Sequence, residues 1–399
     1  MNLKNYISLI KKGFKIKNFI NYFVVIAVTL IFGLISGIGG LNRSTLALLE
    51  QIGYSVIAAV SLSLVVGFLG ELSLGHAAFM SLGAFTGSLF QNAVFPSLSS
   101  SAPLLSLILA MIIGGIIAGL FGFIIGLPAL RLKGDYLAIV TLAFGEIIKI
   151  IFQNMDLFGG VMGFQNKYRY DINSLFIVIF VVLLLALAVI QNLIRSKHGR
   201  AVMAVRDNEI AAKSMGVNVS YYKIAVFVIS AVIAGVAGVL FANTQSTIKS
   251  SKFDYNYSIN LLVMVVLGGM GNVNGTLLAS TVITFIDVKL ATILTGDLAV
   301  IKNIVYALIL IVMVIYNNAP SLKKFRERFN LTNAFNALKK FILTLFNKKK
   351  KTKNSAEEVE FGADWSKIPT KIEMDAILST DLKPDETYDP DVPDKGAKR

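Results

Sequence analysis

Long apolar segments alternate with short polar connections along most of the chain. A transmembrane helix needs about 20 consecutive, mostly apolar residues. Segments of about this length predict ten spans, near 19–39, 53–69, 73–93, 103–127, 136–152, 174–194, 224–242, 257–271, 275–294 and 301–316. An even number of spans places both termini on one side, and Lys/Arg bias in the connecting loops makes that side the cytoplasm. The predicted fold is an all-α polytopic membrane protein with both termini cytoplasmic.

Glycine and polar residues interrupt this pattern twice, between Gly70 and Gly75 and between Gly268 and Gly275. Unwound backbone at membrane depth is tolerated only against protein or a water-filled path. Broken helices are also where transporters tend to bind substrate. We therefore expect broken or re-entrant helices here, which either border a translocation path or only pack together. The residues expected along such a path are Gly70, Ser73, Gly75, His76, Gly268, Gly269 and Gly271.

Composition supports a membrane protein and excludes several kinds of chemistry. The hydrophobic content is 55%, the charged content is 16%, and the mean hydropathy is +0.69. The chain has no cysteine, which excludes disulfides, cysteine-ligated zinc and thiol catalysis. With only two histidines, His76 and His198, no metal site is expected. The net charge of +14 is typical of cytoplasmic Lys/Arg bias, so no nucleic-acid partner is expected.

A polar segment between two uncharged apolar runs carries the strongest local signal. Asp207 and Asn208 are good N-cap residues, the segment 209–215 is rich in helix formers, and Gly216 suits a left-handed C-cap. Glu209 begins the expected helix, where a carboxylate interacts favourably with the helix dipole. The pattern predicts a short capped helix at the membrane surface, and the alternative is an ordinary solvated amphipathic turn.

The same segment resembles a known motif. Its sequence Glu-Ile-Ala-Ala-Lys-Ser-Met-Gly, residues 209–216, resembles the "EAA…G" coupling loop of ABC-importer permeases. Segments 73–86 and 134–148 resemble, in the same order, stretches of the branched-chain amino acid permease family, LivM-type subunit. The resemblance covers about Tyr54 to Tyr316.

The resemblance implies a permease subunit of an ABC importer in the cell (inner or plasma) membrane, transporting branched-chain or related amino acids. The partners implied are two ATP-binding cassette ATPase subunits, a homologous second permease and an extracytoplasmic substrate-binding protein. In this interpretation the loop 195–223 docks into the ATPase, Ala211 and Ala212 keep one face flat enough to enter a groove, and Gly216 permits the turn back to the membrane. The residues implied in coupling are Asp207, Glu209, Ala211, Ala212 and Gly216.

The chain lacks a Gly-x-x-x-x-Gly-Lys-Ser/Thr loop for holding phosphates. ATP and Mg²⁺ are therefore expected on the partner ATPase, and this chain is not expected to be an enzyme. The alternatives are a stand-alone secondary carrier or channel, which needs no ATPase, and a membrane scaffold that acts through its tail.

Six ionisable residues fall within or at the ends of apolar runs. Glu146 and Lys149 are spaced to neutralise each other on one helix face, and Glu71 and His76 are expected near a membrane interface. Asp287 and Lys289 fall within the ninth predicted span. The complete set is Glu71, His76, Glu146, Lys149, Asp287 and Lys289. Their scattered positions argue against a proton relay across the membrane.

Charge changes sharply after the last span. Residues 323–353 hold eleven Lys/Arg and one acid, whereas 354–399 hold twelve Asp/Glu and six Lys/Arg. The basic part predicts an amphipathic helix on the anionic membrane surface, and the acidic part predicts disorder. The expected organisation is a basic N-terminus at 1–18, a permease domain at 19–316, a basic segment at 317–353 and an acidic tail at 354–399.

Overall fold

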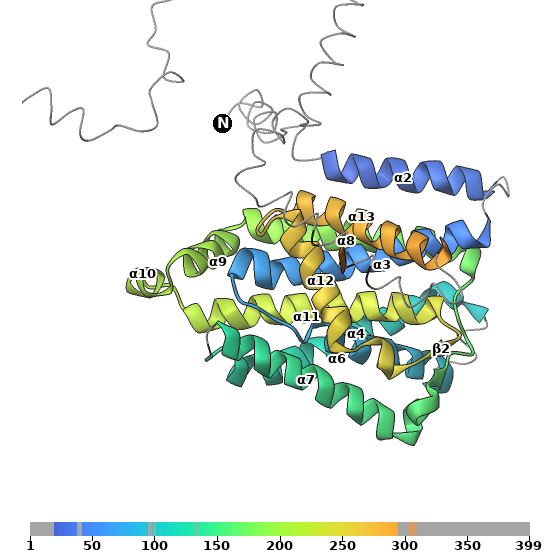
Figure 1. The fold of residues 1–399 in the computed structure, drawn as a ribbon, viewed down its shortest axis with the longest axis horizontal. Helices are drawn as coiled ribbons and strands as arrows, with labels where there is room; N and C mark the ends of the chain where they lie inside the picture. Colours follow the sequence, from blue (N-terminus) through green and yellow to red (C-terminus); the bar gives the residue numbers. More distant parts are fainter. Residues whose placement is uncertain are drawn as a thin grey trace, which may run out of the picture. The chain divides into compact units, whose positions relative to one another are not determined.

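The computed structural model describes residues 20–37, 42–94, 101–132 and 134–293, with a few isolated positions besides these. The chain divides into two units, Met1–Leu322 and Lys323–Arg399, and every described residue belongs to the first (Figure 1). The expected basic N-terminus lies outside the described residues, as do both tail regions. Only isolated positions of the expected last span are described.

Helices form almost all of the described structure (Figure 1). The helices are α2 (Ile20–Gly37), α3 (Arg43–Ser63), α4 (His76–Leu89), α6 (Pro103–Ala129), α7 (Asp135–Asn154), α8 (Ile172–Arg195), α9 (Lys197–Asp207), α10 (Glu209–Ser214), α11 (Val219–Thr244), α12 (Tyr255–Gly268) and α13 (Val273–Ile293). Two are extended by π-helical segments, α3 by η2 (Leu64–Leu69) and α4 by η3 (Phe90–Val94). The 3₁₀ turns are η4 (Asp156–Phe158), η5 (Gly160–Met162) and η6 (Ser250–Lys252). A two-residue antiparallel pair joins β1 (Phe164–Gln165) to β2 (Thr247–Ile248), with Phe164 opposite Ile248.

Five described helices are long and apolar enough to cross a membrane, judged by length and composition. They are Arg43–Leu69, Pro103–Ala129, Ser174–Arg195, Val219–Thr244 and Val273–Ile293. The prediction of a polytopic helical membrane protein is thereby confirmed. Each of the first nine predicted spans corresponds to a helix, but the prediction started the second span at 53, whereas α3 begins at Arg43. The additional turns at the start of α3 include Glu50, which is buried.

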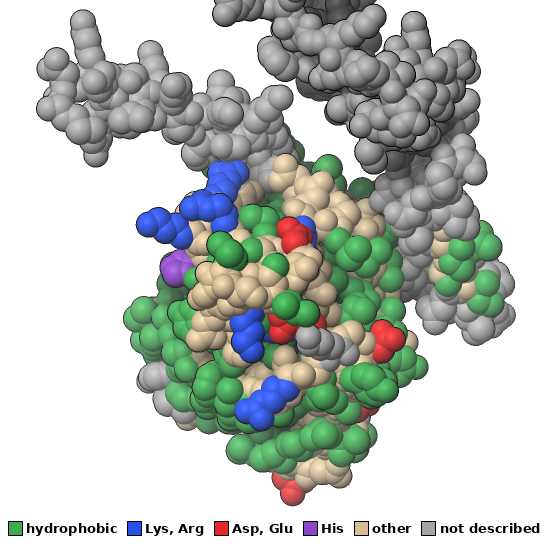
Figure 2. All heavy atoms as spheres, turned by 90° about the vertical axis from the view of Figure 1, so that its left-hand side faces the viewer, with side chains coloured by type: hydrophobic (Ala, Val, Ile, Leu, Met, Phe, Trp, Pro, Cys, Tyr) green, Lys and Arg blue, Asp and Glu red, His purple; other side chains and the backbone are tan. Residues whose placement is uncertain are grey.

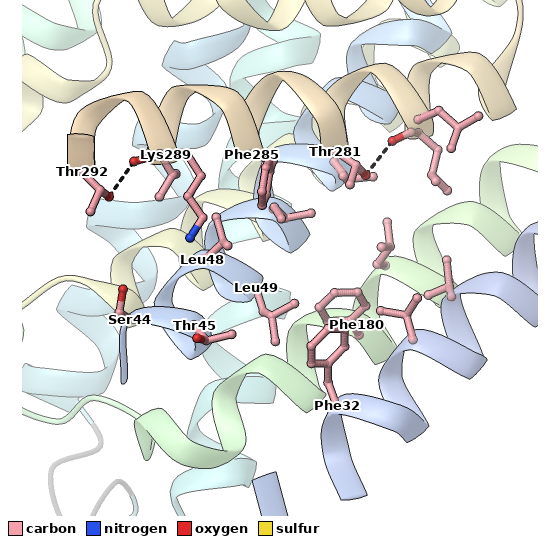
Figure 3. A pocket seen from close by; sticks show the side chains of 18 residues that line it. Phe32, Ser44, Thr45, Leu48, Leu49, Phe180, Thr281, Phe285, Lys289 and Thr292 are labelled. Carbon is pink, nitrogen blue, oxygen red and sulfur yellow. Dashed lines mark hydrogen bonds between the residues drawn. The ribbon is translucent and has the colours of Figure 1, made fainter. Parts of the chain in front are cut away.

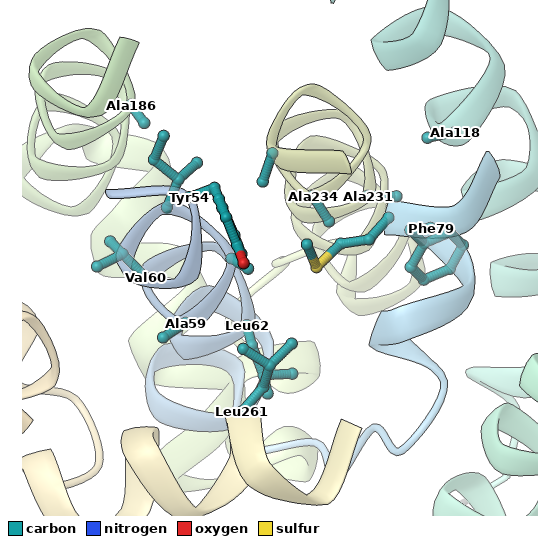
Figure 4. Close-up of a cluster of buried hydrophobic side chains, with 14 of the residues drawn as sticks. Tyr54, Ala59, Val60, Leu62, Phe79, Ala118, Ala186, Ala231, Ala234 and Leu261 are labelled. Carbon is teal, nitrogen blue, oxygen red and sulfur yellow. The ribbon is translucent and has the colours of Figure 1, made fainter. Parts of the chain in front are cut away.

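Small residues allow α3, α4, α6 and α11 to pack closely in the centre of this unit. Figure 4 shows Ala231 and Ala234 on α11 between Tyr54 of α3 and Phe79 of α4. A Cβ atom on Gly83 would overlap the Gly235 carbonyl, and a Cβ atom on Gly238 would overlap the Met80 carbonyl. Close backbone approach of this kind holds membrane helices together, because lipid gives them no hydrophobic reason to associate.

Candidate functional site

The expected capped helix is present as α10. The Asn208 side chain accepts a hydrogen bond from the Ala211 N–H (3.0 Å), and Glu209 is the first helical residue. Gly216 has a φ of +81° just after the helix, the left-handed conformation that a glycine C-cap adopts. The helix ends at Ser214, one residue before the predicted end. Local sequence signals therefore located this element correctly.

The helix that precedes α10 was not predicted. Ser196 caps α9 by accepting a hydrogen bond from the Gly199 N–H (3.2 Å), and this serine was the signal in the sequence. Asp207 is the last residue of α9, and its carboxylate accepts from the neighbouring Arg206 guanidinium (3.1 Å). The expectation that Asp207 is an N-cap is wrong, because Asn208 caps α10 alone.

Figure 2 views the end of the unit that carries α9 and α10, where Lys, Arg, Asp and Glu side chains lie among apolar and other surface atoms. Two large apolar side chains of this segment are strongly exposed, Ile210 (77%) and Met215 (84%). Ala211 is exposed, whereas Ala212 is buried. The expected face containing both alanines is therefore incorrect: Ala212 packs against the body. The outward apolar residues that the sequence interpretation missed are Ile210 and Met215, although two large apolar residues in a short polar segment were a visible signal.

The first interruption is a non-helical segment from Gly70 to Gly75 between η2 and α4. The Leu74 N–H donates to the Thr141 hydroxyl of α7 (3.0 Å), and the Ala77 N–H donates to the Ser258 hydroxyl of α12 (3.0 Å). Thr141 lies six residues into α7, about 9 Å along that helix. The start of α4 is thus inside the helical body, and side chains from other helices satisfy its backbone donors.

His76, the first residue of α4, is also interior. Its Nε2 is 2.7 Å from the Ser61 hydroxyl of α3, and its ring packs edge-on against Phe79. Both His76 and Ser73 are buried. His76 therefore lies inside the protein, and its expected position near a membrane interface stays a prediction.

The second interruption lies between α12 and α13 and is a compact local turn. Gly269 and Gly271 have φ values of +89° and +81°. The Asn272 side chain caps α13 by accepting from the Gly275 N–H (3.2 Å). A Cβ atom on Gly268 would overlap the backbone of Gly275 and Thr276, so the two helices meet backbone against backbone.

The segment η2, which leads into the first interruption, touches the second interruption at Gly271, and Arg206 of α9 lies at this contact. A Cβ atom built on Gly67 would be 2.7 Å from the Gly271 nitrogen. The Arg206 Nη1 donates to the Gly67 carbonyl (3.0 Å), and a Cβ atom on Gly70 would meet the Arg206 side chain. Of the expected path residues, Gly70 and Gly271 are thus brought together around one arginine. Ser73, Gly75 and His76 lie deeper, beside α3 and α7.

A buried lysine forms a second connection from this surface. The Lys223 Nζ at the start of α11 is 2.7 Å from the Glu71 carboxylate and 3.4 Å from the Glu209 carboxylate. Glu71 belongs to the first interruption, and Glu209 begins α10. A mostly buried cation therefore joins the surface helix to the broken one, a contact that sequence spacing does not reveal.

The remaining ionisable groups are structural or outside this site. Glu146 and Lys149 form the expected ion pair on α7. Among the residues that the structure describes, no group of His, Cys, Asp or Glu could hold a metal ion.

These features define the class: a polytopic α-helical membrane protein with two broken helices in contact and a capped helix exposed at one end. Within that class, the chain belongs to the family described as branched-chain amino acid transport system / permease component, whose model matches residues 44–315.

Named relatives agree with this assignment. The chain is similar to the high-affinity branched-chain amino acid transport system permease protein LivM of Salmonella typhimurium, with 34% identity over 57% of this chain and 59% of that protein. For LivM of Escherichia coli the identity is 34%, over 60% of this chain and 62% of that protein. For the probable LivM of Methanocaldococcus jannaschii it is 28%, over 59% and 78%. The chain thus spans about three fifths of the length of the first two relatives. No solved structure matches the chain.

Proposed function

We propose that this chain is the permease of an ABC importer that carries branched-chain or closely related amino acids across the cell membrane. Membership of the permease family and the transport systems named for the LivM relatives support this proposal. The chain itself is not an enzyme: ATP and Mg²⁺ are held by partner ATPase subunits. In this arrangement the chain supplies the path and receives mechanical work.

The observation that carries the proposal is the connection from α9 and α10 to the first broken helix. Exposed Ile210 and Met215 present apolar surface to a partner groove. Behind them, Arg206 holds the Gly67 carbonyl and Lys223 holds Glu71. A surface helix that only joined two spans would need neither contact.

The proposed mechanism follows from these contacts. An ATPase that closes on ATP displaces α9 and α10 together, because the two short helices are joined at Asn208. Arg206 and Lys223 then transmit that displacement to the segment 67–75. Since the segment is held by side chains rather than by a continuous helix, it changes conformation at lower cost than an intact span. The residues Gly70, Ser73, Gly75, His76, Gly268, Gly269 and Gly271 border the path in this proposal.

The proposed assembly has two ATPases, a homologous second permease and an extracytoplasmic binding protein around this subunit. The chain has ten spans with both termini in the cytoplasm, and α10 lies on the cytoplasmic side with its neighbouring basic residues. The proposed coupling residues are Asp207, Glu209, Ala211, Ala212 and Gly216. In view of the structure, Ala212 supports α10 from behind and Ala211 faces the partner.

The first experiment is mild-detergent purification of the full chain from its native membrane, with mass spectrometry of the proteins that accompany it. Walker-motif ATPases and a second permease are the expected companions. Gly216→Pro should remove the ATPases, because proline fixes φ near −65° and cannot adopt the φ of +81° found here. Gly216→Asn is the matched control, since asparagine tolerates the left-handed region. A chain that purifies without ATPases and moves solute in vesicles lacking ATP would establish a secondary carrier instead.

A second variant tests the mechanical connection. Arg206→Ala removes the hydrogen bond to the Gly67 carbonyl, so ATPases should still co-purify and hydrolyse ATP while amino-acid uptake falls at least tenfold. Arg200→Ala is the control, because this exposed arginine bonds only the nearby Arg195 carbonyl (3.4 Å). Equal uptake by the two variants would contradict the proposed route of coupling.

A further inference from the structure

A small polar cavity of about 80 Å³ lies between α3, α12 and α13. It is lined by Gln51, Ser55, Tyr257, Asn260, Leu261, Met264, Thr284 and Asp287. Six of these eight side chains can form hydrogen bonds, in helices that are otherwise mostly apolar. Polar and ionisable groups in membrane helices are costly and commonly mark substrate or ion pathways.

A buried hydroxyl group faces this cavity without a protein partner. Thr284 is 2% exposed, and its Oγ1 has no hydrogen-bond partner among the described residues. A buried polar group without a hydrogen bond carries a free-energy cost. Water or a ligand group in the cavity would remove that cost.

Two carboxylates lie in the same region. Asp287 lines the cavity, and Glu50 precedes the lining residue Gln51 on α3. Glu50 is 3% exposed, and its Oε1 also lacks a hydrogen-bond partner in the described part of the chain. The cavity thus presents several hydrogen-bond acceptors, among them the Asp287 carboxylate.

The nearby lysine of α13 does not line this cavity. Lys289 lines a separate, largely apolar crevice of about 580 Å³ between α2, α3, α8 and α13. Figure 3 shows its amine pointing into that crevice, on the side that also carries Phe285 and Thr292. The amine lies 5.8 Å from the centre of the Phe285 ring. The two faces of α13 therefore differ in chemistry, one apolar with a cation and the other polar with a carboxylate.

We infer that the polar cavity binds the ammonium group of a transported amino acid. An ammonium carries three donors and no acceptor, which matches a site of carboxylate, hydroxyl and amide oxygens. The cavity is large enough for a small polar head group, and Leu261 and Met264 offer apolar contacts beside it. From this cavity α12 runs to the second interruption at Gly268, so the site adjoins the proposed path. The inference rests on the proposed function for the identity of the ligand as an amino acid.

The test uses the purified full chain in detergent and measures its thermal unfolding with three probes. L-Leucine has both an ammonium and a carboxylate, 3-methylbutylamine lacks the carboxylate, and 4-methylpentanoate lacks the ammonium. We expect the first two to raise Tm and the third to leave it unchanged. If 4-methylpentanoate raises Tm as much as 3-methylbutylamine does, the inference is wrong. It is also wrong if neither L-leucine nor 3-methylbutylamine raises Tm.

Variants identify the site. Asp287→Asn should weaken the apparent affinity for 3-methylbutylamine at least tenfold, whereas Lys289→Gln, on the other face of the same helix, should leave it unchanged. Thr284→Val provides a milder second variant if Asp287→Asn does not fold, with an expected three- to tenfold loss. If Lys289→Gln abolishes the Tm shift while Asp287→Asn or Thr284→Val retains it, the ligand occupies the crevice and the inference is wrong.

The thermal-unfolding experiment and the co-purification experiment test different claims, so either can fail while the other succeeds. Absence of ATPases from the purified complex would overturn the proposed function while ammonium binding to the chain could still be measured. Absence of ammonium-dependent stabilisation would overturn the cavity assignment and leave the co-purification result intact.

Discussion

The two interruptions of the helical body are held in different ways. Between Gly269 and Asn272 the turn is stabilised by its own residues: the Gly269 N–H bonds the Val266 carbonyl, and Asn272 caps α13. At the interruption between Gly70 and Gly75, the Glu71 N–H bonds the nearby Val65 carbonyl, but the N–H groups of Leu74 and of Ala77, just inside α4, donate to the Thr141 and Ser258 hydroxyls of other helices. The interruption at 70–75 therefore depends on the arrangement of the surrounding helices. The interruption at 269–272 depends mainly on local sequence.

This difference indicates which interruption can respond to a partner. Lys223 and Arg206 connect the surface helices to the first interruption. The second interruption is connected to the first through the contact of Gly67 with Gly271. A segment whose hydrogen-bond partners lie on several helices changes when those helices move. A self-contained turn instead moves as one piece.

The largest expected effect is at Lys223. Lys223→Met leaves the Glu71 carboxylate largely buried without its cation, and breaking a buried pair in this way costs about 3–5 kcal/mol. The apparent Tm in detergent should fall strongly, and adding Glu71→Gln should recover part of the loss. Lys213→Met, at an exposed position of α10, is the control. A double variant no more stable than Lys223→Met would show that the pair does not support this interruption.

The next effect compares one glycine from each interruption. Gly75→Ala places a Cβ atom on the Thr141 carbonyl, which is backbone and cannot yield easily, so we expect a loss of about 3 kcal/mol. Gly269→Ala meets only the Asn272 Cβ at an ordinary contact distance of 4.0 Å, but it forces alanine to a φ of +89° and a ψ of 118°, at a cost of about 1–3 kcal/mol. Thermal unfolding of the two variants gives the order directly. The reverse order would contradict the tight packing assigned to Gly75.

Smaller effects are expected when the bonds from other helices are removed. Ser258→Ala and Thr141→Val each leave one buried N–H of the segment 74–77 without an acceptor, at about 1–3 kcal/mol. Hydrogen exchange should rise in residues 70–78. Ser280→Ala is the control, because Ser280 bonds only carbonyls of its own helix. Unchanged exchange in both variants would mean that these hydroxyls are dispensable.

The smallest effect is expected at the local turn. Asn272→Ala removes one N-cap and should cost about 1 kcal/mol. Increased hydrogen exchange should stay within residues 269–276 and should not spread to the first interruption. Spreading to residues 70–78 would show that the two interruptions form a single cooperative unit.

Elements with local causes were predicted well. Asn208, Glu209 and Gly216 specify the ends of α10 through caps and backbone conformation, and all three act over a few residues. The long helices followed from apolar runs, and the ion pair of Glu146 with Lys149 followed from spacing on one helix. Errors arose where a polar residue is buried by distant partners. The second span was predicted to start at 53, yet α3 begins at Arg43 and Glu50 is buried within it.

By itself, the sequence determined the class of protein, the positions of most helices, the two glycine-rich interruptions and the capped surface helix. Each depends on neighbours along the chain, through hydrophobic length, capping or the freedom of glycine. Only the tertiary structure decided that Arg206 meets Gly67, that Lys223 joins Glu71 to Glu209, and that Ala212 faces inward while Ile210 faces outward. These contacts join residues up to 152 positions apart, as in the pair of Lys223 with Glu71. Such pairings are selected by the packing of whole helices, which no local pattern of residues encodes.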